Sequence, residues 1–554
     1  MRVKQWITIV AGVILWCAGP ALAASPPLAV SQDIRTLTGT ASAAVLDGET
    51  ILIRDVADVY RALGYEPLWA GPGTEERTER LQAALADAAA HGFNVDDLHF
   101  QKLRLVPTTA TSAEAAARDV LLTDAFLRYS AKLRRGAAPV EALGADWGIA
   151  QPPFVASTAL IEAIRAGRFV DLLESLQPSV RQYRQLMGAL QLYGYYAARG
   201  GWPTIPASGE VRLSADEPRL SVLRQRLHDE DWIASTDAAP NELAAAVRLF
   251  QLRHGLDPDG RIGQKTLAEL NISAAQRVAQ IAANLERWRH LPHRFGAEFA
   301  MVNAADATVE FVQDGALALH MRVIVGDPKH PTPVLNAQIS AVTFNPPWNV
   351  PVSIATKEIL PRMRRDPGYL AANQIEIVNR PQDPYGLGID WRRISRANFP
   401  FQFQQRPGPK NSLGLIKLEM PNRFDVYLHD TPAKGLFNRP GRAFSHGCIR
   451  LERAADFAER LLDQPQWTAA AIQDAIADGE THQVRLTRPV PVYVLYLTAF
   501  VDDAGGVNFR SDIYGRDTAI ARALGPITAP QAKPAVTPVT AEIGCSGPPV
   551  RAAG

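Results

Sequence analysis

One stretch of the sequence concentrates residues that could form a nucleophilic site. His429 ends the string Tyr427-Leu428-His429, and 19 positions later Cys448 stands in Ser445-His446-Gly447-Cys448-Ile449-Arg450. A nucleophilic cysteine needs a base to take its proton, positive potential nearby, and N–H donors for an oxyanion. His429 can supply the base, and the Gly447 and Cys448 amides can supply the donors. The spacing therefore predicts thiol acyl transfer with Cys448 and His429 as the catalytic residues.

Other interpretations of these residues stay open. His446 either shapes the site or only braces its loop, and Arg450 either clamps a substrate carboxylate or forms a structural ion pair. A zinc site built from His429, Asp430, His446 and Cys448 is disfavoured, because the sequence holds no second paired-ligand motif such as Cys-x-x-Cys. We expect no metal and no organic cofactor.

The elements around this stretch must bring the histidine to the thiol. Alternating β-rich runs separated by turn residues begin near residue 297, and runs at 415–419 and 424–429 lead to His429. An amphipathic helix is expected over 451–462, directly after Cys448, where its dipole would lower the thiol pKa. A late hairpin is expected between 492–497 and 507–509. Together these patterns predict a mostly β (α+β) domain over 297–520.

An insertion is expected inside that domain, at about 350–412. It combines a helix over 353–365 with aromatic-rich irregular chain. Such a segment either folds over a site or is a plain surface excursion.

Two helical regions precede the β-rich domain. Residues 30–210 read as a helical scaffold, in which Leu81 and Leu85, and further on Leu122 and Phe126, recur at helical spacing. Residues 217–272 read as three short helices around one core. Their string Phe250-Gln251, Gly255-Leu256, Asp259-Gly260, Gly263 and Thr266-Leu267 resembles a small peptidoglycan-binding domain, either with its affinity intact or as a structural module that has lost it.

Composition and the chain ends narrow the class of protein. The 554 residues are too many for one compact domain and suggest two to four, and a net charge of +1 gives no electrostatic case for binding nucleic acid. Arg2 and Lys4, an apolar run and Ala21-Leu22-Ala23 predict a signal peptide over 1–23, with an uncleaved membrane anchor as the lesser alternative. The Pro-rich residues 525–554 predict a disordered tail.

The catalytic stretch resembles the active-site signature of L,D-transpeptidases with a YkuD-type catalytic domain. Further matching pieces are the Phe344-Asn345-Pro346-Pro347-Trp348-Asn349 block and Gly408-Pro409-Lys410-Asn411. The order of a helical region, a binding module and a catalytic domain with a capping insertion is similar to the large YcbB-type members. The fold class is thus multidomain: an α-helical scaffold, a three-helix module and a mostly β catalytic domain.

The resemblance implies acyl transfer on peptidoglycan stem peptides. Cys448 would form a thioester with a tetrapeptide donor, and an acceptor amine would resolve it as a 3→3 cross-link. Ser445, His446 and Gly447 match the loop that shapes the oxyanion site, and Arg450, Trp348 and Asn349 are candidate substrate contacts. The resemblance also implies a periplasmic location, inactivation by carbapenems and possible cooperation with other cell-wall synthases. Two alternatives remain: an L,D-carboxypeptidase or endopeptidase using the same thiol, and a non-catalytic peptidoglycan-binding scaffold.

Overall fold

The structure, a computed structural model, describes residues 27–39, 45–46, 48–104 and 111–527. These residues form two compact units. Unit 1 contains the described residues up to 88 together with 94–132 and 154–176, and unit 2 contains 89–93, 133–153 and 177 onward. The expected signal peptide and residues 528–554 of the expected tail lie outside the described residues.

Unit 1 is helical apart from one short ribbon, as the sequence predicts. The apolar positions Leu81, Leu85, Leu122 and Phe126 are all buried. The elements that contribute to it are α1 (Pro27–Gly39), β1 (Val45–Leu46), β2 (Glu49–Thr50), α2 (Ile53–Ala62), α3 (Glu75–Ala86), the 3₁₀ turns η2 (Ala88–His91) and η3 (Val95–Leu98), α4 (Phe100–Leu103), α5 (Ser112–Arg135), α6 (Ala156–Arg165) and α7 (Phe169–Ser175).

The three-helix module has its own apolar core. Its helices are α9 (Leu220–Asp229), α10 (Pro240–Arg253) and α11 (Gln264–Leu270). Phe250 and Leu223 are fully buried in that core, and a β-bridge between Val211 and Ile262 ties the preceding chain to it. The three short helices predicted over 217–272 are therefore confirmed.

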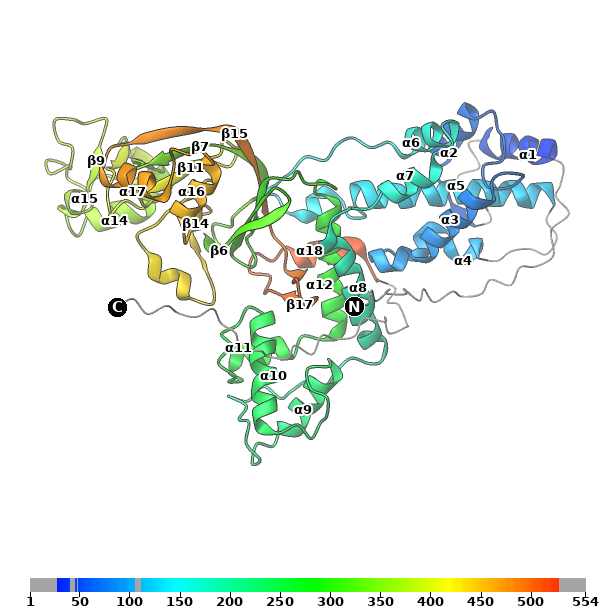
Figure 1. Ribbon diagram of the computed structural model, residues 1–554, viewed down its shortest axis with the longest axis horizontal. Coiled ribbons are helices and arrows are strands. Elements are labelled where there is room, and N and C mark those ends of the chain that lie inside the picture. Colours follow the sequence, from blue (N-terminus) through cyan, green and yellow to red (C-terminus); the bar gives the residue numbers. More distant parts are fainter. Residues whose placement is uncertain (1–26, 40–44, 47, 105–110, 528–554) are drawn as a thin grey trace, which may run out of the picture. The chain divides into compact units, whose positions relative to one another are not determined.

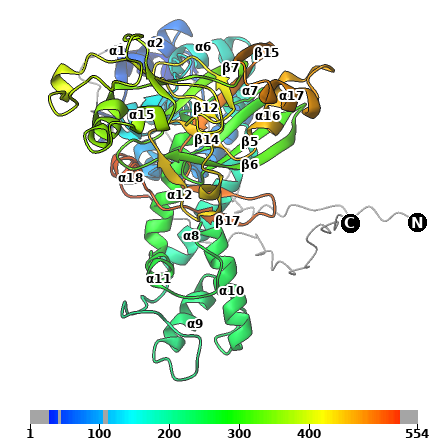
Figure 2. The ribbon, with the colours of Figure 1, turned by 90° about the vertical axis from the view of Figure 1, so that its left-hand side faces the viewer.

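The helical region expected over 30–210 does not stay in one unit. Its last helix, α8 (Arg181–Ala198), belongs to unit 2 and packs beside α12 (Ala274–Arg289), as Figures 1 and 2 both show. Because α12 is buried around most of its circumference, its charged residues need partners inside the protein. Arg277 pairs with Glu269 at 2.6 Å, and Arg289 pairs with Glu286 at 2.5 Å.

The catalytic domain is built on a ten-stranded sheet that closes on itself. Its strand order is β11-β12-β14-β6-β5-β4-β15-β7-β3, and a further pairing joins β11 to β7. Closure gives the sheet an interior that alternate side chains fill. The strands are β3 (Trp147–Gly148), β4 (Phe299–Asn303), β5 (Thr308–Gln313), β6 (Ala316–Gly326), β7 (Val334–Phe344), β11 (Ile416–Glu419), β12 (Leu428–His429), β13 (Ala443–Ser445), which pairs β6 off the main path, β14 (Ile449–Leu451) and β15 (His482–Leu495).

Two sequence expectations for this domain are wrong. Residues 507–509 (β17) pair with β16 (Ala499–Val501) and not with 492–497, because β15 is long and is already paired with β4 and β7. The helix after Cys448, α16 (Ala454–Leu462), begins only after the strand β14. The remaining elements of unit 2 are the 3₁₀ turns η4 (Val140–Leu143) and η7 (Lys434–Asn438), α17 (Ala469–Ala477) and α18 (Asp517–Leu524).

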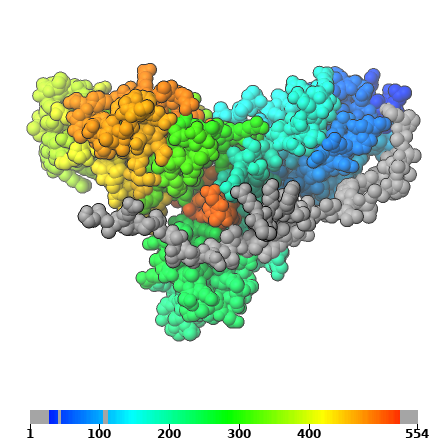
Figure 3. Space-filling model, viewed as in Figure 1, coloured from blue at the N-terminus to red at the C-terminus, as the bar shows by residue number. Residues whose placement is uncertain are grey.

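The insertion folds as a small lobe with its own sheet and core. Figure 3 shows it in yellow-green at the surface of the catalytic domain. Its sheet has the order β8-β10-β9 and a core around Met363, Trp391 and Phe403. The elements are β8 (Trp348–Val350), a continuous helical segment made of α13 (Val352–Ile354), a π-helical turn η5 (Ala355–Ile359) and α14 (Leu360–Met363), then α15 (Tyr369–Ala372), β9 (Ile375–Ile377), the 3₁₀ turn η6 (Arg396–Asn398) and β10 (Phe403–Gln405).

Candidate active site

Three neighbouring strands place the predicted catalytic histidine among cationic side chains. Strand β12 pairs antiparallel with β11 and parallel with β14, so that His429 is in register with Lys417 on one side and Arg450 on the other. Residues paired across a sheet project from the same face. Lys417 and Arg450 therefore lie on the same face of the sheet as His429. The two-residue segment Leu428–His429 forms a strand because it pairs with β11 on one side and with β14 on the other.

The loop before Cys448 is fixed by hydrogen bonds through Ser445 and Thr332. The Gly447 N–H donates to Ser445 Oγ at 3.1 Å, and that hydroxyl donates to the Cys448 carbonyl at 2.5 Å. Gly447 has a φ of +110°, which side-chain-bearing residues rarely adopt. The buried Thr332 hydroxyl donates to the Gly447 carbonyl at 2.9 Å and accepts from the Gly326 N–H at 2.8 Å. The Gly447 N–H is thus already hydrogen-bonded to Ser445 within the loop. The assignment of residues 445–447 to an oxyanion site stays a prediction.

The thiol of Cys448 is partly exposed and is surrounded by hydrogen-bond donors. It is a free cysteine, with Sγ 4.0 Å from the carbonyl oxygen of Asp425. Burial raises the pKa of the thiol above its ordinary value, while the backbone N–H and hydroxyl of Tyr427 and the charges of Arg450 and Lys417 act to lower it. The balance leaves the pKa raised. The expected lowering by a helix dipole is wrong for two reasons: α16 begins six residues after Cys448, and burial dominates.

His429 is buried and neutral. Its side-chain Nδ1 lies 2.5 Å from the carbonyl oxygen of Asp430. Burial, and after it the charge of Arg450, lowers the pKa of His429 to about 4, although the carbonyls of Asp430 and Leu413 favour the protonated ring. The backbone carbonyl of Asp430, and not its carboxylate, therefore orients the histidine. That carboxylate accepts from Lys434 Nζ at 2.5 Å and from the Leu415 N–H at 3.0 Å.

Tyr427 is a site residue that sequence reasoning does not single out. Its hydroxyl donates to the Cys448 sulfur and accepts from the indole N–H of Trp348, and burial with the nearby thiol raises the Tyr427 pKa. Its ring also lies 4.7 Å from Lys417 Nζ. The available signal was its position two residues before His429, which puts both side chains on one face of an extended chain.

The predicted substrate contacts lie in different environments. Arg450 is largely buried, which lowers its pKa, and its Nε has no hydrogen-bond partner among the described residues. Trp348 is half-buried, and its indole N–H donates to the Tyr427 hydroxyl. Asn349 is exposed and accepts from Gln404 Nε2 at 2.8 Å across β8 and β10. Their contact with a substrate stays a prediction.

The insertion reaches the catalytic loop through one acidic side chain. Glu358 Oε1, on the π-helical turn, lies 2.7 Å from His446 Nε2. The ring of His446 also lies 4.5 Å from the ring of His330, measured between centroids. Of the two interpretations left open for the insertion, the structure thus supports the one in which it extends to the site.

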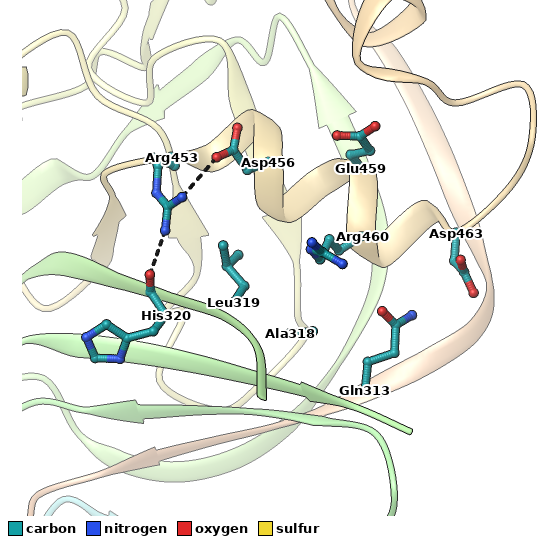
Figure 4. A pocket seen from close by; sticks show the side chains of 9 residues that line it. All are labelled: Gln313, Ala318, Leu319, His320, Arg453, Asp456, Glu459, Arg460 and Asp463. Atoms are coloured by element: carbon teal, nitrogen blue, oxygen red, sulfur yellow. Dashed lines mark hydrogen bonds and ion pairs between the residues drawn. The ribbon is translucent and has the colours of Figure 1, made fainter. Parts of the chain in front are cut away.

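A separate polar hollow lies away from these residues. Its volume is about 560 Å³, and it lies between β5, β6 and α16. Figure 4 shows Arg453 there, bridging the His320 carbonyl and the Asp456 carboxylate. None of the predicted site residues lines it.

Within the described part of the chain, no three or more His, Cys, Asp or Glu side chains are arranged to hold a metal ion. Over the same residues, no helix combines the length and apolar character needed to cross a bilayer.

Comparisons with known proteins match three successive parts of the chain. A scaffold domain model matches residues 54–190, a model described as "Putative peptidoglycan binding domain" matches 217–270, and the L,D-transpeptidase catalytic domain model of the YkuD family matches 297–492. The last match contains His429, Cys448 and the whole insertion.

Two individual proteins show the extent of similarity. A Haemophilus influenzae protein named "Putative L,D-transpeptidase" is 36% identical over 244 residues, which is 44% of this chain and 48% of the relative, so the chain spans about half the length of that relative. A solved structure titled "Structure of the Ldtfm-avibactam carbamoyl enzyme" aligns with 36% of this chain and 49% of that one at 12% identity and a TM-score of 0.17, too low a similarity to support an argument. The domain matches nevertheless agree with the fold and with the cysteine site. This chain therefore carries a YkuD-type L,D-transpeptidase catalytic domain behind a scaffold domain and a peptidoglycan-binding domain, an order consistent with a YcbB-like architecture.

Proposed function

We propose that this protein is a peptidoglycan L,D-transpeptidase that forms 3→3 cross-links between stem peptides through a thioester on Cys448. The observation that carries the proposal is the placement, within a YkuD domain, of a buried neutral imidazole at the end of strand β12 and a partly exposed thiol directly before the parallel neighbouring strand β14. The peptidoglycan-binding domain matched at 217–270 supports peptidoglycan as the substrate.

In the first step, Cys448 Sγ attacks the carbonyl that joins the third residue of the donor stem to terminal D-Ala. The C–S bond forms, the C–N bond breaks, and the thiol proton passes through His429 to the departing amine of D-Ala. Because the pKa of the thiol is raised and that of His429 is lowered, the resting pair is a neutral thiol and a neutral imidazole. The proton therefore moves during the attack, and the Tyr427 hydroxyl and the charges of Arg450 and Lys417 stabilise the negative sulfur as it develops.

In the second step, an amine of a neighbouring stem peptide attacks the thioester carbonyl. A new C–N bond forms, the C–S bond breaks, and the proton of the amine returns through His429 to the sulfur. Water in place of the amine would release a tripeptide. The choice between cross-linking and hydrolysis therefore depends on how the acceptor is held.

We place this activity in the periplasm, on the basis of the signal-peptide pattern over 1–23 and the binding domain. From the family resemblance we also propose that the protein cooperates with other cell-wall synthases and contributes to cell shape. A carbapenem would acylate Cys448 by the first step, because its strained ring offers a carbonyl to the same nucleophile.

The test is mass spectrometry of the purified full chain, and of Cys448→Ala, incubated with disaccharide-tetrapeptide. We expect loss of D-Ala and a dimer joined through two third-position residues, both absent in the variant. Tripeptide monomer alone would replace the proposal with a hydrolase. No turnover and no covalent adduct with a carbapenem would leave only a binding scaffold.

A further inference from the structure

Glu358 is a carboxylate that the insertion brings to the rim of the cysteine site. It lies on the π-helical turn Ala355–Ile359, between two stretches of α-helix. A π turn contains one residue more than an α turn and rotates the side chains that follow, and such turns are frequent at functional sites. Here the turn directs Oε1 to within 2.7 Å of His446 Nε2, with both side chains a little over one-third exposed.

Apart from the Asp425 carbonyl, which accepts from the thiol, the groups that act on Cys448 are donors or cations. Arg450 and Lys417 act on the sulfur by charge, and Tyr427 donates hydrogen bonds to it. Glu419, the acidic residue nearest to Lys417 in the strand, has both of its oxygens engaged: Oε2 with Lys417 Nζ at 2.8 Å and Oε1 with the Thr343 hydroxyl at 2.9 Å. Each of its oxygens therefore already has a donor.

Glu358 differs from Glu419 because it retains binding capacity. Among the described residues, its second oxygen, Oε2, has no hydrogen-bond partner, and its first oxygen contacts a histidine that is itself partly exposed. The charge of Glu358 also reaches Arg450, whose pKa it acts to raise against the effect of burial. Arg450 in turn acts on Cys448, so this carboxylate lies within electrostatic range of the reacting centre.

A partly exposed carboxylate with an oxygen that has no hydrogen-bond partner among the described residues is suited to bind an ammonium group. The second step of the proposed reaction requires an amine acceptor, and amines of stem peptides are protonated at neutral pH. We propose that Glu358 binds the primary ammonium group of the acceptor stem peptide and so directs the acyl group on Cys448 to an amine and not to water. This inference rests on the proposed function, because it concerns the second half of that reaction.

The binding step precedes the chemistry. The acceptor ammonium would displace or share the contact with His446, lose one proton to solvent, and attack the thioester as the neutral amine. Acylation of Cys448 precedes acceptor binding, so Glu358 acts on acylation only indirectly, through the charge of Arg450. Removal of the charge should therefore change the products formed from the thioester far more than the rate at which the thioester forms.

The test uses the full chain with Glu358→Gln, which keeps the shape of the side chain and removes its charge. With disaccharide-tetrapeptide, we expect the ratio of 3→3 dimer to tripeptide to fall about tenfold or more, as for loss of a charge-assisted hydrogen bond. The rate of Cys448 acylation by a carbapenem should fall by a clearly smaller factor than the product ratio, because the charge of Glu358 acts on the thiol only through Arg450. Glu358→Asp, which restores the charge, should recover part of the ratio.

The matched control is Glu376→Gln. Glu376 is also a carboxylate of the insertion, but it lies on β9, at the opposite edge of the small sheet from β8, and pairs with Arg406 at 2.5 Å. We expect its product ratio to match the wild type.

The outcomes separate this inference from the proposed function. A product ratio unchanged in Glu358→Gln would overturn the inference. An equal fall in dimer formation and in carbapenem acylation would also overturn it, because Glu358 would then only hold the catalytic loop through His446. A wild-type protein that is acylated but makes only tripeptide would overturn the proposed transpeptidation, and this inference with it.

Discussion

His429 is paired in register with Arg450 across the parallel strands β12 and β14, so a buried imidazole faces a largely buried guanidinium. The histidine cannot gain a proton there without cost, because burial and the like charge of Arg450 both oppose the protonated imidazole. Burial first, and the charge of the paired Arg450 second, lower the pKa of His429 to about 4, so the base is neutral before substrate arrives.

The pH dependence of acylation follows from this pairing. Since the base must be neutral, the rate of Cys448 acylation by a carbapenem should be lost only as the pH falls through about 4. Arg450→Gln removes the like charge, so the pKa of His429 should rise toward its ordinary value and the acid limb should move to higher pH. Stopped-flow acylation across pH 3 to 8 measures this shift. Arg453→Gln, in the separate polar hollow, is the control and should leave the limb in place.

The Tyr427 hydroxyl should set the reactivity of the thiol. Tyr427→Phe keeps the ring and removes the donor to the sulfur, so the already raised pKa of Cys448 should rise further. A hydrogen bond to a charged group contributes about 1.5–3 kcal/mol, which corresponds to a fall of roughly 10- to 100-fold in acylation rate. The pH profile of iodoacetamide alkylation reports the thiol pKa directly. Tyr385→Phe removes a hydroxyl inside the insertion and should change neither quantity; an unchanged Tyr427→Phe profile would contradict the role.

Thr332 should be required for the conformation of the catalytic loop. Thr332→Val preserves shape but leaves the Gly447 carbonyl and the Gly326 N–H without their buried partner. We expect a loss of about 2 kcal/mol in the free energy of unfolding, together with slower Cys448 acylation. Urea unfolding and acylation kinetics check the two effects. Thr356→Val, whose hydroxyl bonds only to backbone carbonyls of its own helix, should cost less than about 1 kcal/mol and leave acylation unchanged.

Glu286 should make unit 2 sensitive to acid. Burial raises the pKa of this carboxyl, but hydrogen bonds and charge from His290 and Arg289, with the Ala138 N–H, outweigh burial and lower the pKa to about 2. Because the folded pKa lies below the unfolded value near 4.5, the stabilisation is present above about pH 4.5 and is lost as the pH falls toward 2. Its size is about 3 kcal/mol.

The matching variant is Glu286→Gln, which leaves Arg289 buried without its 2.5 Å partner. We expect it to lower the free energy of unfolding at pH 7 by about 3 kcal/mol or more, and to flatten the dependence on pH between 4.5 and 2. Glu298→Gln is the control, because that carboxylate pairs with the exposed Arg488 at 3.5 Å. Chemical unfolding at several pH values would show equal slopes for both variants if Glu286 had no such role.

Short-range patterns were sufficient for much of the fold. The β-rich runs were expected from near residue 297, where β4 begins at Phe299, and the run at 415–419 matches β11 within one residue. Helical spacing located the buried stripes of unit 1 and the three helices of the module. The segment after Cys448 was misread, because Ile449–Leu451 has the composition of either a strand or a first helical turn. Its pairing with β6 and β12, far away in sequence, decides the matter.

Residue type and spacing alone predict the candidate pair His429 and Cys448, the glycine of the loop between them, and the order of the domains. The electrostatics of the site follow instead from tertiary contacts. The neutral state of His429, the raised pKa of Cys448, the donors of Tyr427 and the contact of Glu358 with His446 depend on burial and on neighbours brought together by long-range strand pairing and by the insertion. The free energy of a charge depends on what surrounds it in space, and no local pattern of residues specifies that surrounding.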